Sequence, residues 1–429
     1  MKITIQPGKI AGEIAAIPSK SHLHRLLIYA AFADRDTLIC CRETEAEDIN
    51  ATINCLTALG AKITRKESGF VVTPVDRKNI PQGGDKPVFF PCGESGSTLR
   101  FMLPVVCALG VRSAFEMKGR LPERPLAPLD EQLEKHGIRL WRDTPEILQC
   151  EGKLQPGDYY LPGNISSQYI SGILMAMALL ETPGRLTVSA PIESAGYIEM
   201  TLNTAEIFGQ KVAVKKTSQG FEYDVGGTLK SPGQAETEGD WSNSAFWLCA
   251  GAMPGGNVKL NGLLNNSSQG DREVFEILSR MGATIRYEGT TITVTENERR
   301  CTEIDARAIP DLIPVLAAVA TVSSGTTVVS NAARLRIKES DRLMAVTKTL
   351  SIMGANIKET AEGLIIKGVE KLRGGTIDAH GDHRIPMMAA IASTACTEPV
   401  TVIGAQAVNK SYPEFWNDLR LMGKTVTEE

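Results

Sequence analysis

Met281-Gly282-Ala283-Thr284-Ile285 joins the end of a helix-like stretch to the start of a strand-like one, and the same join recurs along the chain. Glycine stands at each of the six joins: Gly60, Gly137, Gly209, Gly282, Gly354 and Gly423. Successive glycines are 77, 72, 73, 72 and 69 residues apart, which indicates an internal repeat. Gly suits the end of a helix because it has no Cβ and adopts the left-handed conformation without steric cost.

Two short runs of alternating apolar and polar residues follow each join. After Gly60, residues 62–65 and 70–73 alternate on either side of Ser68-Gly69, which predicts a hairpin. Each period also leaves room for a second helix and further strands, so each unit is a small α/β module. The last copy stops at Val426 without its second strand. Because residues 2–5 and 13–16 have strand character, we expect the N-terminus to complete the module that the C-terminus leaves open.

The repeat predicts an α/β protein of two similar domains with three modules each. Six modules in 429 residues exceed what one hydrophobic core covers, since cores stop growing near about 250–300 residues. We predict a first domain at residues 19–238 and a second made of residues 1–18 and 239–429, closed by the N-terminal strand. The chain then crosses twice, at hinges near 17–20 and 237–241. The polar, Gly-bounded stretch 233–240 is typical of a linker.

Composition narrows the class of protein. A net charge of −4 and 5% aromatic residues disfavour a nucleic-acid binder, which would need a basic imbalance and stacking aromatic side chains. The nine cysteines form no Cys-x-x-Cys pair, so we expect free thiols in a reducing compartment, the cytoplasm. No apolar signal core follows Met1, and the longest apolar run, 170–180, is shorter than the roughly 20 residues that span a bilayer. No membrane partner is expected.

Basic residues gather where Gly, Ser and Pro also gather. The first such cluster is Pro18-Ser19-Lys20-Ser21-His22-Leu23-His24-Arg25. The apolar run after it predicts a helix, with Ser19 or Ser21 as its cap. A helix N-terminus with hydroxyls and two cations is suited to bind an anion, although a capped helix with surface cations explains it equally well. Similar clusters are Cys92–Arg100, Gly119–Leu126, Asn164–Tyr169, Ile309–Asp311, Arg334–Leu343, Gly381–Arg384 and Asn409–Pro413.

Each of these clusters also has an ordinary structural interpretation. The charged run 334–342 is typical of a solvated helical face. The stretch 92–100 lacks the Gly-Lys-Ser/Thr ending of a nucleotide-binding loop, so a nucleoside triphosphate is not implied. His380, Asp382 and His383 are contiguous and have no fourth ligand, so we expect no metal site.

Together the clusters resemble the 5-enolpyruvylshikimate-3-phosphate synthases over residues 20–410. The motifs recur in the order Ser-Lys-Ser-x-x-x-Arg, Gly-x-x-Gly-Ser/Thr-x-x-Arg, Glu-Arg-Pro, Ser-Ser-Gln, Ile-Pro-Asp, Lys-Glu-Ser/Thr-Asp-Arg-Leu and Asp-His-Arg. The resemblance implies the enolpyruvate transferase fold, an inverse α/β barrel type with three βαβαββ units per domain. The chain departs from the family pattern in three places. Ile17-Pro18 stands where many members have Pro-Gly, Glu94 stands where Asn is common, and Arg334 replaces another Asn.

The resemblance also implies residue roles. Shikimate 3-phosphate would be bound by Lys20, Ser21, Arg25, Ser166, Ser167, Gln168, Tyr197, Asp311 and Lys338. Phosphoenolpyruvate would be bound by Lys20, Gly96, Arg124, Gln168, Arg342, Arg384 and Lys410. Asp311, Glu339 and Lys20 would be catalytic.

The implied reaction transfers the enolpyruvyl group of phosphoenolpyruvate to the 5-hydroxyl of shikimate 3-phosphate and releases phosphate, in chorismate and aromatic amino-acid biosynthesis. The reaction needs an acid and a base. Asp311 would accept the proton of the 5-hydroxyl and Glu339 would deliver a proton to phosphoenolpyruvate, or the two roles would be reversed. No redox step occurs, so no cofactor is expected. Anionic substrates need matching cations from both domains, which predicts closure of a monomer around them.

Two alternatives remain at this point. One is the related UDP-N-acetylglucosamine enolpyruvyl transferase, which usually carries a Cys in the loop before its Arg-Pro, whereas residues 119–125 have none. The other is a non-catalytic repeat scaffold that binds proteins. A scaffold gives no reason for carboxylates between anion-binding motifs.

Overall fold

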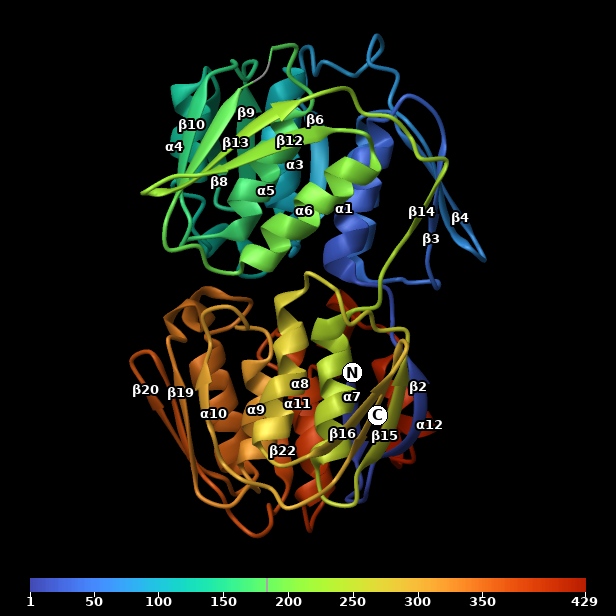
Figure 1. The fold of residues 1–429 in the computed structure, drawn as a ribbon, viewed down its shortest axis with the longest axis vertical. Helices are drawn as coiled ribbons and strands as arrows, with labels where there is room; N and C mark the ends of the chain where they lie inside the picture. Colours follow the sequence, from blue (N-terminus) through green and yellow to red (C-terminus); the bar gives the residue numbers. More distant parts are fainter. Residues whose placement is uncertain (183) are drawn as a thin grey trace. The chain divides into compact units, whose positions relative to one another are not determined.

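The computed structural model describes residues 1–182 and 184–429. Contacts within the chain divide these residues into two units. Unit 1 comprises Met1–Ser19, Thr44–Ala46 and Glu238–Glu429, and unit 2 comprises Lys20–Glu43 and Glu47–Thr237. Unit 2 is therefore inserted between the first and last segments of unit 1, and the short segment Thr44–Ala46 of unit 1 interrupts it. The helices and strands of each unit are labelled in Figure 1.

Unit 2 begins with a helix and ends with a short strand. Its elements are α1 (Lys20–Ala31), β3 (Thr37–Cys40), α2 (Glu47–Ala58), β4 (Lys62–Lys66), β5 (Gly69–Thr73), β6 (Val88–Gly93), α3 (Gly96–Leu109), β7 (Ser113–Met117), η1 (Leu121–Glu123), α4 (Leu129–Lys135), β8 (Arg139–Thr144), β9 (Ile147–Glu151), β10 (Asp158–Pro162), α5 (Ser167–Met177), β11 (Arg185–Ser189), α6 (Ala195–Ile207), β12 (Lys211–Lys216), β13 (Gly220–Gly226) and β14 (Gln234–Glu236). Here η denotes a 3₁₀-helix.

Unit 1 contains the two ends of the chain. Its elements are β1 (Lys2–Ile5), β2 (Ala11–Ala15), α7 (Trp241–Ala252), β15 (Asn257–Asn261), η2 (Gly270–Glu273), α8 (Val274–Arg280), β16 (Thr284–Glu288), β17 (Thr291–Thr295), β18 (Glu303–Asp305), α9 (Ile313–Ala320), β19 (Thr326–Ser330), η3 (Ala333–Ile337), α10 (Arg342–Ile352), β20 (Asn356–Thr360), β21 (Gly363–Lys367), β22 (Gly375–Asp378), α11 (Arg384–Ala392), η4 (Ser393–Ala395), β23 (Val400–Ile403), η5 (Ala405–Lys410), α12 (Phe415–Leu421) and β24 (Val426–Glu428).

The strands of residues 1–182 and 184–429 form six four-stranded sheets of one design. In the order β6-β7-β9-β8, the first pair is parallel and the other two pairs are antiparallel. A parallel pair needs a crossover, and α3 supplies it between β6 and β7. With α4 before the hairpin, this module reads βαβαββ. The predicted fold class and module are confirmed.

Backbone conformation explains the repeat. All six glycines at the joins have positive φ, with values of 101° at Gly60, 94° at Gly137, 73° at Gly209, 93° at Gly282, 94° at Gly354 and 94° at Gly423. Residues with a Cβ rarely adopt this conformation, so each glycine ends its helix and turns the chain toward the next strand.

The chain ends close a sheet, as predicted. β1 pairs antiparallel with both β23 and β24, so it takes the place that the second hairpin strand holds in other modules. β2 pairs parallel with β15 and opens a different module. The linker assignment of residues 233–240 is wrong in part, because β14 pairs parallel with β3. Its backbone hydrogen bonds, rather than its polar side chains, make it a strand.

Helices form the interior of each unit and sheets form its outside (Figure 1). Every residue of α7, α9 and α11 is buried, and these helices pack against one another in unit 1. A helix that is apolar all round, such as Ile-Pro-Val-Leu-Ala-Ala-Val-Ala in α9, is stable only when neighbours cover it on every side. In unit 2, α3 packs against α5 in the same way.

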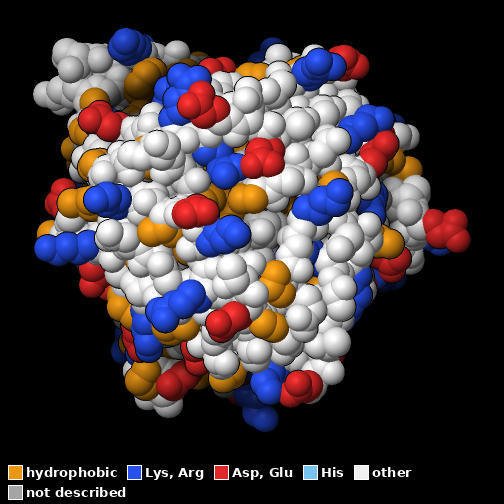
Figure 2. All heavy atoms as spheres, turned by 90° about the horizontal axis from the view of Figure 1, so that it is seen from below, with side chains coloured by type: hydrophobic (Ala, Val, Ile, Leu, Met, Phe, Trp, Pro, Cys, Tyr) orange, Lys and Arg blue, Asp and Glu red, His pale blue; other side chains and the backbone are white. Residues whose placement is uncertain are grey.

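The exterior carries both signs of charge. On the face in Figure 2, Lys and Arg side chains lie interspersed with Asp and Glu and with hydrophobic side chains. Among the helices of the described residues, none is both long enough and apolar enough to cross a membrane.

Candidate active-site residues in the two units

In unit 2, several of the predicted site residues lie at helix N-termini. Lys20 and Ser21 begin α1, Gly96 begins α3, and Ser166 caps α5 by accepting a hydrogen bond from the backbone N–H of Gln168. The partial positive charge of a helix N-terminus favours bound anions. The local sequence therefore places these residues where a bound anion would be stabilised.

Lys20 has a carboxylate partner that the sequence did not reveal. Its Nζ donates to Asp48 Oδ2 at 2.6 Å, and the Asp48 side chain on α2 is buried. Holding the ammonium in this way orients Lys20. On the neighbouring turn of α2, Thr52 bonds both His24 and Thr98, which ties α1, α2 and α3 together.

Arg25 is buried within a network of hydrogen bonds. Its guanidinium donates to Thr201 Oγ1 at 2.7 Å, to the Ser21 carbonyl at 2.6 Å and to the Tyr197 carbonyl at 2.9 Å. Burial lowers the pKa of Arg25 to about 10, which still leaves it charged at neutral pH. These bonds fix the backbone of Ser21 on α1 and of Tyr197 on α6, and both residues are predicted to bind shikimate 3-phosphate.

Gly96 lies between two guanidinium groups. A Cβ built on Gly96 would stand 2.7 Å from Arg100 Nη1 and 2.9 Å from Arg124 Nη1. Arg124 was predicted to bind phosphoenolpyruvate, whereas Arg100 was not. Arg100 also donates to Gln168 Oε1 at 2.8 Å, and Gln168 in turn donates to Ser97 Oγ at 2.8 Å. The starts of α3 and α5 are thereby joined around a pair of cations.

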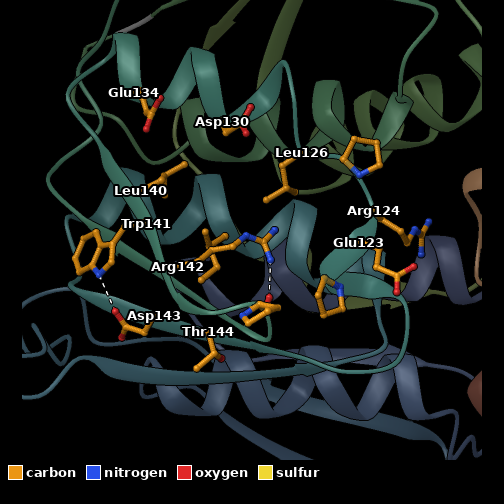
Figure 3. A pocket seen from close by; sticks show the side chains of 14 residues that line it. Glu123, Arg124, Leu126, Asp130, Glu134, Leu140, Trp141, Arg142, Asp143 and Thr144 are labelled. Carbon is orange, nitrogen blue, oxygen red and sulfur yellow. Dashed lines mark hydrogen bonds between the residues drawn. The ribbon is translucent and has the colours of Figure 1, made fainter.

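A separate hollow of about 720 Å³ borders the Arg124 segment (Figure 3). It lies between residues 122–126, α4 and the β8–β9 hairpin, and its lining includes Leu126, Leu140 and Trp141. In Figure 3 Arg124 lies at the edge of the hollow, beside Glu123. Among the residues that line it, Arg124 alone was predicted to belong to the site. We therefore do not assign the substrates to this hollow.

In unit 1, Arg342 is the centre of the predicted residues. Its side chain is 1% exposed and contacts three carboxylates: Asp382 Oδ2 at 2.7 Å, Glu339 Oε2 at 2.7 Å and Asp311 Oδ1 at 2.5 Å. Burial alone would lower the pKa of Arg342, but these carboxylates raise it instead. A permanently charged Arg342 thus holds Asp311 and Glu339, the two predicted proton-transfer groups, on one guanidinium.

Asp311 and Lys338 have opposite responses to burial. Burial would raise the pKa of Asp311, yet Arg384, Lys338 and Arg342 together hold it well below its usual value. Burial lowers the pKa of Lys338 to about 8, although Asp311 opposes this. Lys338 Nζ lies 3.9 Å from Asp311 Oδ1. Near neutral pH Asp311 is therefore a carboxylate, and Lys338 is close to its titration point.

Arg384 is the first residue of α11 and is buried. Its Nη2 donates to Ser242 Oγ at 2.7 Å, and its Nε lies 3.5 Å from Asp311 Oδ1. The Asp382 carboxylate accepts from the Arg384 backbone N–H at 3.0 Å and thereby satisfies one of the free N–H groups in the first turn of the helix. The first turns of α7 and α11 and the residues before α9 consequently meet around this guanidinium.

The remaining unit 1 residue, Lys410, is buried at the end of η5. Within the described part of the chain, no three His, Cys, Asp or Glu side chains are grouped so as to hold a metal ion. Sequence reasoning missed Asp48, Arg100, Ser242 and Asp382 as parts of the charged clusters. Arg100 and Asp382 stood inside quoted motifs but were given no role, whereas Asp48 and Ser242 carried no signal beyond being polar residues in the first turn of a helix.

Similarity to known proteins supports an assignment to a class. Solved EPSP synthase structures from Acinetobacter baumannii are similar to this chain, and one has a TM-score of 0.77 and 26% identity with full coverage of both chains. The enolpyruvyl transferase NikO from Streptomyces tendae shares the fold at a TM-score of 0.77 and 16% identity, covering 99% of this chain and 98% of its own. The fold is that of the enolpyruvyl transferases.

The family follows from sequence similarity. The family model described as EPSP synthase (3-phosphoshikimate 1-carboxyvinyltransferase) matches residues 5–419. Relatives named 3-phosphoshikimate 1-carboxyvinyltransferase are 39% identical in Clostridium beijerinckii, over 99% of this chain and 98% of the relative, and 39% identical in Clostridium perfringens, over 100% of both. The chain belongs to the EPSP synthase family and is a transferase. Neither the UDP-N-acetylglucosamine enzyme nor the repeat scaffold is supported.

Proposed function

We propose that this protein transfers the enolpyruvyl group of phosphoenolpyruvate to the 5-hydroxyl of shikimate 3-phosphate and releases phosphate. One observation carries the residue assignment: the Arg342 guanidinium contacts both Asp311 and Glu339. The reaction needs an acid and a base at one small site, and this arrangement provides two carboxylates in fixed relation. Family membership identifies the substrates.

The proposed steps use these carboxylates in turn. Glu339 delivers a proton to the methylene carbon of phosphoenolpyruvate, which leaves positive character at C2. The 5-hydroxyl attacks C2 and forms the new C–O bond while its proton passes to Asp311. Phosphate then leaves the tetrahedral intermediate as the C–O bond to it breaks, and it takes up the proton that Asp311 had accepted. The Glu339 carboxylate removes a methyl proton, which regenerates both the double bond and the protonated Glu339. We propose that Lys20 shares one of the two proton transfers.

Binding roles are proposed from charge and position. Arg124 and Gly96 in unit 2, and Arg342, Arg384 and Lys410 in unit 1, would bind phosphoenolpyruvate. Ser166, Ser167, Gln168 and Tyr197, with Ser21 and Arg25, would bind shikimate 3-phosphate. We propose that residues of both units act on the same substrates, since several negative charges must be matched by cations already in place.

We also propose that substrate binding closes the protein about its two chain crossings. In support, Pro18 and Gly239 form an antiparallel bridge, so the two crossings run side by side. The Ser19 N–H donates to the Glu238 carbonyl at 2.8 Å and the Asp240 N–H to the Ile17 carbonyl at 2.9 Å. Saturating shikimate 3-phosphate should reduce the radius of gyration in solution scattering. An unchanged radius would contradict closure.

The function is tested by phosphate release. Wild-type protein should release phosphate only when both substrates are present, and Asp311→Ala should abolish the release. Asp305→Ala, which removes an exposed carboxylate paired with Arg307 on the surface, is the matched control and should be active. Release with UDP-N-acetylglucosamine in place of shikimate 3-phosphate, or an active Asp311→Ala protein, would contradict the proposal.

We propose that the enzyme is a cytoplasmic monomer that needs no cofactor. Its nine cysteines are free thiols, which suits a reducing compartment. Light scattering coupled to size exclusion should give the mass of one chain, 46.3 kDa. Full activity after dialysis against a chelator is expected.

A further inference from the structure

Asp271 is a buried carboxylate that the proposed mechanism does not use. It lies in η2, its side chain is 1% exposed, and it accepts a hydrogen bond from Ser242 Oγ at 2.5 Å. Ser242 has one hydroxyl hydrogen and gives it to Asp271, so its oxygen is available to accept from Arg384 Nη2 at 2.7 Å. These two hydrogen bonds connect Asp271 through Ser242 to Arg384 and are called the hydrogen-bonded chain below.

We propose that Asp271 is a positioning residue for Arg384 in the phosphoenolpyruvate site, acting through the Ser242 hydroxyl. This inference rests on the proposed function, because it takes Arg384 as a ligand of that substrate. A carboxylate acceptor makes the Ser242 oxygen more electron-rich, which strengthens the bond that it accepts from the guanidinium. The chain thereby fixes the direction in which Arg384 presents its other N–H groups.

Neighbouring groups hold both ends of this hydrogen-bonded chain in place. The amide of Gln269, two residues before Asp271, donates to the Gly239 carbonyl at 2.8 Å and accepts from the Trp241 N–H at 3.0 Å. These bonds attach the start of η2 to the start of α7, where Ser242 lies. At the other end, Phe246 of α7 lies 6.0 Å beneath the Arg384 guanidinium. The geometry leaves Asp271 and Ser242 little freedom to move apart.

Arg384 has hydrogen-bonding capacity left for a ligand. Its buried Nε–H makes no hydrogen bond within the described residues, although it lies 3.5 Å from Asp311 Oδ1. A guanidinium that is anchored on one edge and unsatisfied on another is prepared to bind a carboxylate or phosphate. Anchoring matters because an unanchored side chain would lose entropy when the substrate binds.

Retention of this carboxylate is costly for stability. Burial, with the charges of Asp311 and Asp240, raises the pKa of Asp271 to about 6, although Arg384 and the Ser242 hydrogen bond act to lower it. A raised pKa in the folded state means that the protonated form contributes stability at low pH and that this contribution is lost as the pH rises through about 6. A purely structural role would be served as well by an uncharged side chain.

The test uses Asp271→Asn and Ser242→Ala in the full-length protein, with phosphate release measured against each substrate. Ser242→Ala should raise KM for phosphoenolpyruvate about tenfold, because a hydrogen bond to a charged group is lost. Asp271→Asn, which has the shape of the protonated acid, should raise it about threefold to tenfold. KM for shikimate 3-phosphate should stay within twofold in both. Ser323→Ala, which removes another buried serine hydroxyl of unit 1, should change neither constant.

Two further readouts separate positioning from support of the fold. The double variant should be no worse than Ser242→Ala alone, since both changes break one chain. In wild type, KM for phosphoenolpyruvate should rise as pH falls through about 6, whereas in Asp271→Asn it should be high and flat over that range. Melting temperature at pH 7 should not fall in Asp271→Asn.

Failure of this inference can be told apart from failure of the proposed function. If wild type releases no phosphate from the two substrates, the function is wrong. If wild type is active and Asp271→Asn leaves KM for phosphoenolpyruvate unchanged, or affects both substrates equally with a lower melting temperature, the positioning role is wrong. Additive effects in the double variant would also overturn it.

Discussion

The Lys20 ammonium and the Asp48 carboxylate lie 2.6 Å apart, and both side chains are largely removed from solvent. Removing one partner of such a pair leaves the other without compensation, which costs more than the pair itself contributes. Lys20 is predicted to be catalytic and depends on Asp48, a residue that no motif indicated.

Asp48→Asn should weaken catalysis through Lys20. The amide keeps the shape but loses the charge that orients the ammonium, so kcat/KM should fall about tenfold. Lys20→Met should lower it at least about a hundredfold if Lys20 takes part in proton transfer. Steady-state phosphate release measures both. If the double variant is much worse than Lys20→Met alone, Asp48 acts independently of Lys20.

Gly96→Ala should weaken phosphoenolpyruvate binding. The added methyl would lie 2.7 Å from Arg100 Nη1 and 2.9 Å from Arg124 Nη1, so these guanidinium groups must move. We expect KM for phosphoenolpyruvate to rise about tenfold or more, because a misplaced cation no longer matches the anion. KM for shikimate 3-phosphate should change little. A variant with unaltered KM for phosphoenolpyruvate would show that Arg124 does not contact that substrate.

Lys338 should set the alkaline limit of activity. Since burial lowers its pKa to about 8, Lys338 is charged below that pH and neutral above it. Anion binding favours the charged form, so kcat/KM should fall as pH rises through about 8. Lys338→Arg stays charged and should move this fall to higher pH, although its activity at pH 7 will be reduced by the altered shape. Identical alkaline limbs in both proteins would exclude Lys338 as the titrating group.

Two of the repeat glycines form a matched pair for a stability test. Gly282 and Gly423 have φ of 93° and 94°, but a Cβ on Gly282 would lie 2.1 Å from the Glu298 carbonyl, whereas one on Gly423 meets nothing within 4 Å. Gly423→Ala should cost about 1–2 kcal/mol from backbone strain alone. Gly282→Ala should cost at least about 2 kcal/mol more, because it also needs backbone to move. Denaturant unfolding of the two variants measures the difference, and equal losses would contradict this reasoning.

Much of the fold could be predicted because glycine has a specific physical role. Each join needs a residue at positive φ, and this requirement left a periodic mark in the sequence. The alternating residues after it predicted hairpins, and the unpaired last copy predicted that β1 closes its sheet. β14 could not be predicted, because Gln-Ala-Glu has no apolar pattern and pairs with β3 through its backbone alone.

The candidate residues were predicted from motifs that combine cations with Gly or Ser. Arg342 and Arg384 were found in this way. Asp48, the partner of Lys20, and Asp271, the partner of Ser242, were not found, because either carboxylate in a sequence is indistinguishable from an exposed one until burial is known. Ser242 in turn resembles an ordinary residue in the first turn of a helix. Spatial neighbours that are far apart in the sequence are visible only in the fold.

The insertion of unit 2 within unit 1 imposes an order on synthesis. Residues 20–237 include all the strands of the unit 2 sheets, so this unit can acquire its sheets while the rest of the chain is still on the ribosome. β1 leaves the ribosome before every other described strand, whereas its partners β23 and β24 follow all the others. β1 must therefore remain unpaired until residues 400–428 have been synthesised, and a nascent chain stalled before residue 400 should contain a protease-resistant unit 2 and a cleavable segment at residues 1–19.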